Sequence, residues 1–172
     1  MGQNKKYEYV ELKSIEELPS KYWDINVKDY ITTIAFEEVK DESDIAKQEE
    51  SITTFIKGLP QKIRLIFTVY DLDTEVHNGT YEQYFSNFSG NYKDVILSDL
   101  EYLGAEEIAI ITDKAIKGYQ SFESKGFPED EYEDFIRSVT DEFYKAYEGE
   151  SLHELSVEFI RENIEYFKHL DL

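Results

Sequence analysis

The chain has 172 residues, and its 38 acidic side chains against 18 basic ones give a formal net charge of −20. Long-range repulsion therefore excludes binding to DNA, RNA or an anionic membrane through a basic face. Because 41% of the residues are hydrophobic and 15% are aromatic, the sequence predicts one folded domain over 1–172 instead of the disorder typical of acidic chains.

The composition also excludes several classes of site. The chain has no cysteine, which removes disulfides, thiolate metal sites and cysteine nucleophiles. The longest apolar runs, such as Ile108–Ile111, are far shorter than the roughly 20 residues of a membrane-spanning helix. The first residues lack the apolar stretch of a signal peptide. We therefore expect a cytoplasmic protein with no membrane partner.

The apolar spacing in the first half of the chain is mostly helical. We expect residues 1–20 to be extended or loosely ordered, followed by a helix from about Trp23 to Lys40. Asp44 is predicted to cap a second helix that ends at Gly58-Leu59-Pro60. Residues 61–77 are apolar almost all round, which suits a buried helix or a buried strand. They are too long for a typical strand, so a helix is favoured.

Glycines and caps divide the second half of the chain. Asn78-Gly79 is expected to end the central helix, because both residues tolerate positive φ. We predict the following elements: a short aromatic helix to Ser89-Gly90, a helix over 92–103 closed by Gly104, a helix over 105–117, a loop over 118–128, and a pair of acidic helices over 129–148 and 151–170, the second capped by Ser151 with Glu154. The fold class is all-α, with about eight helices.

One segment suggests catalysis. In residues 66–74 an apolar run ends in Asp71-Leu72-Asp73, the arrangement in which haloacid-dehalogenase-type phosphotransferases present a nucleophile and a general acid beside Mg²⁺. That arrangement requires a strand in a parallel α/β sheet, and no alternation of strands and helices surrounds it. It also requires Thr or Val where this chain has Glu75. A Mg²⁺-dependent phosphotransferase or hydrolase is therefore the weaker alternative.

Metal ligation is a second chemical alternative. On a helix, Asp71 would share a face with Glu75, and Asp73 with His77. The chain contains neither a His-Glu-x-x-His pattern nor a twelve-residue calcium loop. Chance pairs at this spacing are expected among 38 carboxylates. We expect no catalytic residue, no metal and no cofactor, and a protein that is not an enzyme.

The charge pattern is more informative. Residues 129–165 contain 13 acidic side chains and three basic ones. In the last predicted helix, glutamates recur every four residues and form a row of like charges. Like charges at this spacing slightly destabilise a helix, so helix stability does not explain the row. On a helix, its members would follow one another at about 6 Å. We predict that the row imitates DNA phosphates, the alternative being an ordinary solvated face; its residues are Glu150, Glu154, Glu158 and Glu162, with Glu165 near the same face and Asp130, Asp134 and Glu142 on a neighbouring row.

Residues 73–90, followed by Leu103-Gly104-Ala105-Glu106, carry a more specific pattern. The segment resembles a bacterial domain family of unknown function with the pattern Asn-Gly-Gly-Phe-x-Gln-Phe-Phe-x-Asn-x-x-Gly, and the match covers about 60–118. Thr80 stands at the second glycine and Tyr81 at the first Phe. We interpret the motif as mainly structural, with amides that satisfy buried backbone groups; its residues are Asn78, Gly79, Gln83, Phe85, Asn87, Gly90 and Gly104. The alternative is a ligand pocket lined by Asn78, Gln83 and Asn87.

The family that the chain resembles includes an acidic, dimeric and mainly helical DNA mimic that binds a helix-turn-helix transcription factor in place of DNA. This resemblance implies an acidic protein that competes with DNA for a basic DNA-binding protein, as a homodimer. The alternative partner is a basic nuclease toxin, in which case the chain would be an immunity or antitoxin protein. In neither case does the chain bind nucleic acid directly.

Overall fold

The computed structural model describes residues 15–126, 128–168 and 170. The predicted all-α fold is confirmed, because the described residues form helices and no strand. The α-helices are α1 Trp23–Glu38, α2 Ile45–Gly58, α3 Gln61–Ser86, α4 Ile96–Leu103, α5 Glu106–Lys125, α6 Glu129–Tyr147, α7 Leu152–Glu162 and α8 Ile164–Lys168, and the 3₁₀ helices are η1 Ile15–Glu17, η2 Ser20–Tyr22 and η3 Phe88–Tyr92. Of the segment 1–20 that was predicted to be extended or loosely ordered, residues 1–14 lie outside the described residues. Residues 15–17 and 20–22 form 3₁₀ helices, with Ile15 buried, so the prediction is wrong there. No helix in the described ranges has the length and hydrophobicity needed to cross a bilayer.

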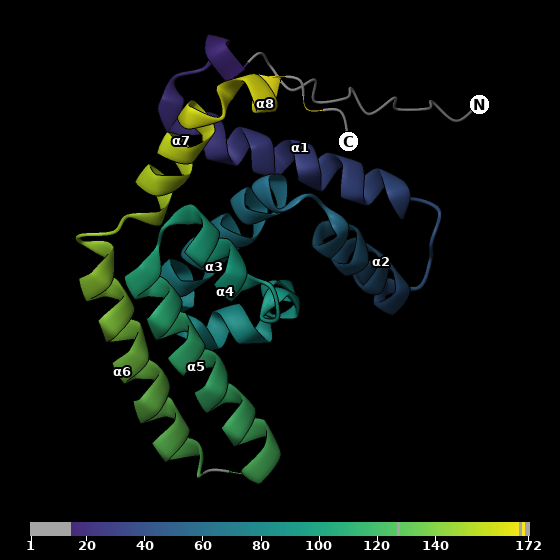
Figure 1. The fold of residues 1–172 in the computed structure, drawn as a ribbon. Helices are drawn as coiled ribbons and strands as arrows, with labels where there is room; N and C mark the ends of the chain where they lie inside the picture. Colours follow the sequence, from purple (N-terminus) through teal and green to yellow (C-terminus); the bar gives the residue numbers. More distant parts are fainter. Residues whose placement is uncertain (1–14, 127, 169, 171–172) are drawn as a thin grey trace.

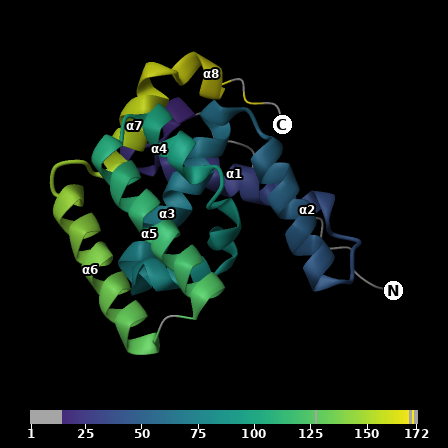
Figure 2. The same cartoon turned by 60° about the horizontal axis from the view of Figure 1, so that its bottom comes forward.

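Helix α3 lies at the centre of the fold, and α1, α4, α6 and α7 pack around it (Figures 1 and 2). Its first five turns place apolar side chains on every side, and Leu65, Ile66, Val69, Leu72 and Val76 have no exposed surface. A helix that is apolar all round is stable only when other elements cover it. The interpretation of residues 61–77 as a buried helix is therefore confirmed.

Helix α3 is kinked at Gly79–Thr80, where the predicted end of the helix lies. The residue with positive φ is Thr80 (φ 73°, ψ 176°), and neither Asn78 nor Gly79 has one, so that part of the prediction is wrong. The Tyr81 backbone N–H comes directly after the kink. This N–H donates to Thr140 Oγ1 of α6 (3.3 Å), and the Tyr81 hydroxyl contacts Thr112 Oγ1 of α5 (2.8 Å). These bonds fix the last turns of α3 against the α5–α6 pair.

Helices α5 and α6 form an antiparallel pair that extends away from the rest of the molecule (Figure 1). The predicted loop over 118–128 is wrong, because α5 continues to Lys125 and ends at Gly126. The extra turns are stabilised by packing that a local pattern does not reveal. The Phe122 ring stacks on Tyr132 of α6 at 4.1 Å between centroids. A Cβ on Gly118 would lie 2.0 Å from the Phe135 ring, so glycine permits this close approach.

Helix ends elsewhere follow the predicted chemistry, with two differences. Asp44 and Ser151 accept backbone N–H bonds as N-caps, and Gly104 closes α4 with φ 89°. The predicted helix over 151–170 is divided at Asn163, whose side chain donates to the Phe159 carbonyl and accepts from Lys62 Nζ. The predicted helix over 92–103 begins only at Ile96, because residues 88–92 form η3.

A buried carboxylate joins α3 to α4. Asp99 has no exposed surface, and its carboxylate accepts hydrogen bonds from Arg64 Nη2 (2.7 Å) and Thr68 Oγ1 (2.9 Å). The hydrogen bond to Asp99 raises the pKa of Arg64 above its ordinary value, with burial opposing the shift. A buried charge needs such partners, since each unpaired polar group in the interior costs free energy.

Asp99→Ala should lower the free energy of unfolding by about 3 kcal/mol, because it leaves the Arg64 charge half-buried without its partner. Urea denaturation followed by circular dichroism measures this loss. Asp94→Ala is the control: Asp94 pairs with Lys57 at the surface (2.7 Å), and exposed pairs contribute less than about 1 kcal/mol. Equal losses in the two variants would contradict a stabilising role for the buried pair.

Thr80→Gly should raise the free energy of unfolding by about 1 kcal/mol. The φ and ψ of Thr80 fall in a region used almost only by glycine, and such strain costs about 1–3 kcal/mol. Glycine at this position loses the hydrogen bond that Thr80 Oγ1 accepts from the Glu82 N–H (3.2 Å). Replacing such a helix-capping side chain by glycine costs about a few tenths of a kcal/mol, which is less than the strain removed. Thr33→Gly, within α1, is the control and should destabilise the protein in the same urea titration. A lower free energy of unfolding in Thr80→Gly as well would contradict backbone strain at Thr80.

Candidate functional site

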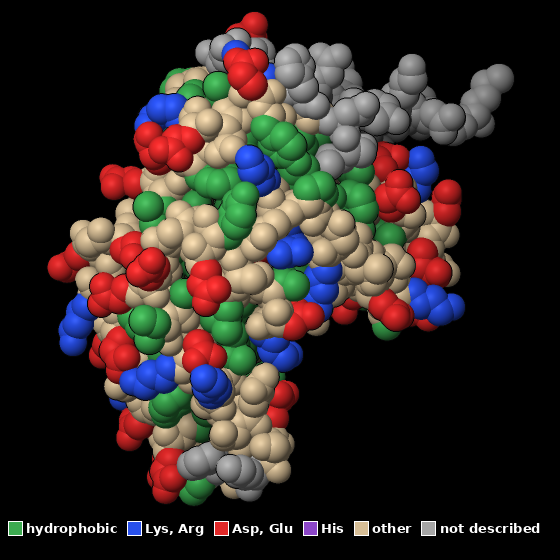
Figure 3. Space-filling model, viewed as in Figure 1, with side chains coloured by type: hydrophobic (Ala, Val, Ile, Leu, Met, Phe, Trp, Pro, Cys, Tyr) green, Lys and Arg blue, Asp and Glu red, His purple; other side chains and the backbone are tan. Residues whose placement is uncertain are grey.

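The predicted acidic residues lie on different parts of the surface. Helix α6 packs mainly against α5 and α3, whereas α7 packs against α1, α3 and α4 (Figures 1 and 2). The two acidic helices therefore do not form one packed pair. On the face shown in Figure 3, acidic side chains are mixed with lysines and arginines along the α5–α6 pair. On that face, the acidic side chains of α6 and α7 do not form one continuous acidic surface.

Several carboxylates of the row along 150–165 have partners within the protein. The Glu150 carboxylate accepts the backbone N–H of Ile108 at 2.9 Å, so it caps the N-terminus of α5 and has a structural role there. Glu158 pairs with Arg161, and Glu165 pairs with Lys168 at 2.8 Å. Glu154 and Glu162 are exposed on α7. Local ion pairs thus weaken the field of this row.

The neighbouring row on α6 is also divided. Glu142 pairs with Lys114 of α5 (2.6 Å), whereas Asp130 and Asp134 are exposed near the start of α6. Arg137, which the i, i+4 pattern pairs with Glu133, instead lies 3.7 Å from Asp134. The first two turns of α6 are the most acidic part of the helix, and the positive end of the helix dipole favours carboxylates in the first of them.

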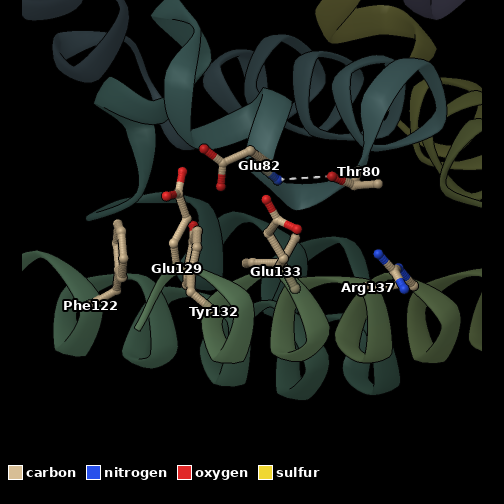
Figure 4. Close-up of a pocket in the computed structure, with 8 residues that line it drawn as sticks. Thr80, Glu82, Phe122, Glu129, Tyr132, Glu133 and Arg137 are labelled. Atoms are coloured by element: carbon tan, nitrogen blue, oxygen red, sulfur yellow. Dashed lines mark hydrogen bonds between the residues drawn. The ribbon is translucent and has the colours of Figure 1, made fainter. Parts of the chain in front are cut away.

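The kink in α3 brings one more carboxylate to this end of α6. Figure 4 shows Glu82 facing Glu129 and Glu133 across an open cavity. We name the following set the α6 acidic group: Glu82, Glu129, Asp130, Glu133 and Asp134. Of this group, the sequence pattern predicts only Asp130 and Asp134. No sequence signal joins Glu82 to α6, because the two are neighbours only through the kink.

The cavity itself has a volume of about 500 Å³, and its lining residues are Thr80, Glu82, Phe122, Glu129, Tyr132, Glu133, Ile136 and Arg137. Its floor is formed by the stacked rings of Phe122 and Tyr132. Tyr132 is only 7% exposed, and its hydroxyl has no hydrogen-bond partner among the described residues. Burial raises the pKa of this hydroxyl far above its ordinary value, and the nearby Glu82 carboxylate adds to the shift. The hydroxyl therefore stays protonated.

The family-motif residues lie around the kink of α3, and two of their side-chain amides bond one carboxylate. The Glu75 carboxylate accepts hydrogen bonds from the side-chain amides of both Gln83 and Asn87, each at 2.7 Å, and so joins the two sides of the kink. The expectation that these amides satisfy buried backbone groups is thus wrong. A Cβ on Gly79 would lie 2.1 Å from the Gln83 Oε1, and one on Gly90 would lie 2.5 Å from a backbone oxygen. Phe85 is buried and stacks on Tyr119, and Asn78 is exposed.

The phosphotransferase interpretation loses its structural basis, because Asp71 and Asp73 lie within α3 and follow no strand. Asp73 accepts a hydrogen bond from the Tyr147 hydroxyl (2.9 Å), and burial raises its pKa against that bond. Burial also raises the pKa of Asp71 to about 6. Among the described residues, no three potential ligands are placed to hold a metal ion. His153 Nδ1 lies 2.7 Å from Asp24 Oδ2, and His169 lies outside the described residues.

Comparison with protein families matches residues 57–167 to the family described as DMP19-like protein. The chain belongs to the DMP19-like family. The family is named after DNA-mimic protein 19. The match extends beyond the 60–118 segment that carries the motif and includes the α6 acidic group and α7. Comparisons with curated proteins and with solved structures give no significant match.

Glu150→Ala should lower the free energy of unfolding by about 1 kcal/mol, because it removes the acceptor for the first N–H groups of α5. The exchange rate of the Ile108 amide, measured by NMR, should rise together with this loss. Glu162→Ala is the control, since Glu162 is exposed at the end of α7 and its removal should change stability by less than about 0.5 kcal/mol. An unchanged stability in Glu150→Ala would contradict the capping role.

Proposed function

We propose that the protein is a DNA mimic that occupies the DNA-binding surface of a basic protein, a helix-turn-helix regulator, and competes with DNA for it. Membership of the DMP19-like family supports a DNA-mimic role. The observation that carries the proposal is the α6 acidic group, which concentrates five carboxylates at one end of a helix. No catalytic step is needed for this function.

The α6 acidic group has the properties that a phosphate mimic requires. Within the described ranges, no lysine, arginine or histidine forms an ion pair with Glu82, Glu129 or Glu133. These charges are therefore available to a partner. They are attached to packed helices, so the spacing of their backbone positions is fixed before binding, and the cost of ordering is confined to the side chains. Carboxylates one helical turn apart, such as Glu129 and Glu133, follow one another at about 6 Å.

The mechanism is displacement by competition. A DNA-binding protein holds its lysines and arginines where phosphates position it on the duplex. A rigid acidic surface can pair with the same side chains, and DNA and the mimic then exclude one another. The net charge of −20 accelerates the encounter through electrostatic steering, which salt weakens. The exposed Glu154 and Glu162 on α7 add to this long-range field. A homodimeric state and a cytoplasmic location remain predictions.

Capture of partners from a host lysate at low salt, followed by a competition assay, tests the proposal. The captured protein should bind a fluorescent DNA duplex, and the chain should displace that duplex in an anisotropy titration. The concentration of chain required should rise steeply with salt. A ternary complex of chain, partner and DNA would overturn the proposal. If the captured protein is a nuclease, and the chain inhibits it without displacing DNA, the immunity alternative would be established.

Two variants that each remove three negative charges distinguish the α6 acidic group from the α7 row. We expect Glu129→Gln/Asp130→Asn/Asp134→Asn to raise the inhibition constant at least about ten-fold, a loss of about 1.4 kcal/mol of binding free energy. Glu154→Gln/Glu158→Gln/Glu162→Gln should raise it by no more than about three-fold, since Glu158 is already paired with Arg161, and Glu154 and Glu162 contribute only to the long-range field. Thermal unfolding by circular dichroism verifies that both variants fold. A larger effect of the α7 variant would place the interface on α7.

A further inference from the structure

The cavity between α3 and α6 combines features that the α6 acidic group alone does not require. Glu82 comes from α3, and Glu129 and Glu133 come from the facing side of α6 (Figure 4). Arg137 is the one cation that lines the cavity among the described residues, and its guanidinium lies 3.7 Å from Asp134. Three carboxylates against one guanidinium leave the cavity negative. It is therefore complementary to a cation.

The Tyr132 hydroxyl is a second observation at this cavity, because no described group bonds it within hydrogen-bond distance although the Glu82 carboxylate lies nearby. Buried polar groups almost always have a hydrogen-bond partner, and an unsatisfied one destabilises the fold. The Tyr132 hydroxyl has none among the described residues, although its ring is more than nine-tenths buried. Figure 4 shows the Tyr132 side chain directed toward Glu82 and Glu129. A donor placed between these carboxylates would supply the hydroxyl oxygen with its missing hydrogen bond.

The apolar residues that line the cavity indicate which kind of cation it would bind. The Phe122 and Tyr132 rings are stacked within 14° of parallel, and Ile136 completes an apolar surface. A guanidinium is flat, weakly hydrated and rich in donors, so it can lie against an apolar lining while it bonds several carboxylates. An ammonium group is compact and strongly hydrated, and it gains less from such a floor. A divalent metal does not fit, because no three potential ligands in the described chain are placed to share one ion.

We propose that this cavity binds an arginine side chain of the basic partner. Glu82, Glu129 and Glu133 accept hydrogen bonds from the guanidinium, and the Tyr132 oxygen accepts one more. The volume of about 500 Å³ lies within the range of small-ligand sites. Thr80 assists through its side chain, since its Oγ1 accepts from the Glu82 N–H at 3.2 Å and so orients the first turn after the kink. The inference rests on the proposed function, to which it adds a site of specific recognition.

Blocked pentapeptides with one central arginine or one central lysine are suitable probes, because they carry the same charge. In a ¹H–¹⁵N NMR titration of the full chain at low salt, the arginine peptide should shift the amide signals of Thr80, Glu82 and Glu133. Its dissociation constant should be at least about five-fold lower than that of the lysine peptide. Equal affinities for the two peptides would overturn the inference.

Charge-matched double variants locate the binding. Glu82→Gln/Glu133→Gln should abolish the preference for arginine. Asp141→Asn/Glu148→Gln also removes two exposed carboxylates, but neither residue lines the cavity, and the preference should persist. If the two double variants weaken arginine binding equally, the attraction is a property of the net charge, and the cavity is not a specific site. The proposed function would survive that result, provided that the chain still displaces DNA.

Tyr132→Phe separates the hydroxyl from the ring. The variant keeps the stacking on Phe122 and removes an unpartnered buried oxygen, so we expect unchanged or higher thermal stability. Arginine binding should nevertheless weaken about three-fold, because one acceptor is lost. A variant that is less stable and binds arginine as tightly as the natural chain would show that the hydroxyl serves the fold, and would overturn its part in the site.

Discussion

The kink of α3 at Gly79–Thr80 directs the end of this helix onto the α5–α6 pair. Before it, α3 is a buried axis that collects the other helices, and after it, the same helix turns toward α6. The redirected segment is held by the Glu75 carboxylate, which bonds Gln83 and Asn87, and by the Tyr81 N–H, which bonds Thr140. A straight α3 would leave Glu82 without its neighbours on α6. The family motif therefore shapes the candidate site without contributing most of its ligating atoms.

The excess of acidic side chains divides into two populations. Asp99, Glu75 and Glu150 are each bonded to groups of the protein itself: a guanidinium and a hydroxyl, two amides, and backbone N–H groups. These carboxylates contribute to the net charge of −20 but are engaged within the fold. In the row along 150–165, local ion pairs such as Glu158 with Arg161 similarly reduce the negative charge available to a partner. In the proposed function, the position of the carboxylates that have no basic partner in the fold matters more than the net charge.

The sequence was sufficient for the parts of the fold that local chemistry determines. The helical period, the caps at Asp44 and Ser151 and the glycine at Gly104 all depend on residues within one turn of each other. The failures depend on contacts between distant residues. The last turns of α5 exist because Phe122 stacks on Tyr132, and the carboxylate of Glu150 meets α5 across 42 residues. The set of acidic residues that lie together could not be predicted, because it depends on how α3 bends and how α6 and α7 separate.

A DNA mimic faces a problem of specificity, because net negative charge attracts every basic protein. Long-range steering raises the rate of all such encounters and distinguishes few of them. Discrimination requires contacts that a partner satisfies only with the right group in the right place. DNA itself uses flat base edges for that purpose, and a helical protein has none. Side chains can recognise a planar cation when carboxylates lie beside aromatic rings and a buried hydroxyl lacks a hydrogen-bond partner. The rigid α6 acidic group would then determine where a partner docks, and the cavity would determine which partner remains bound.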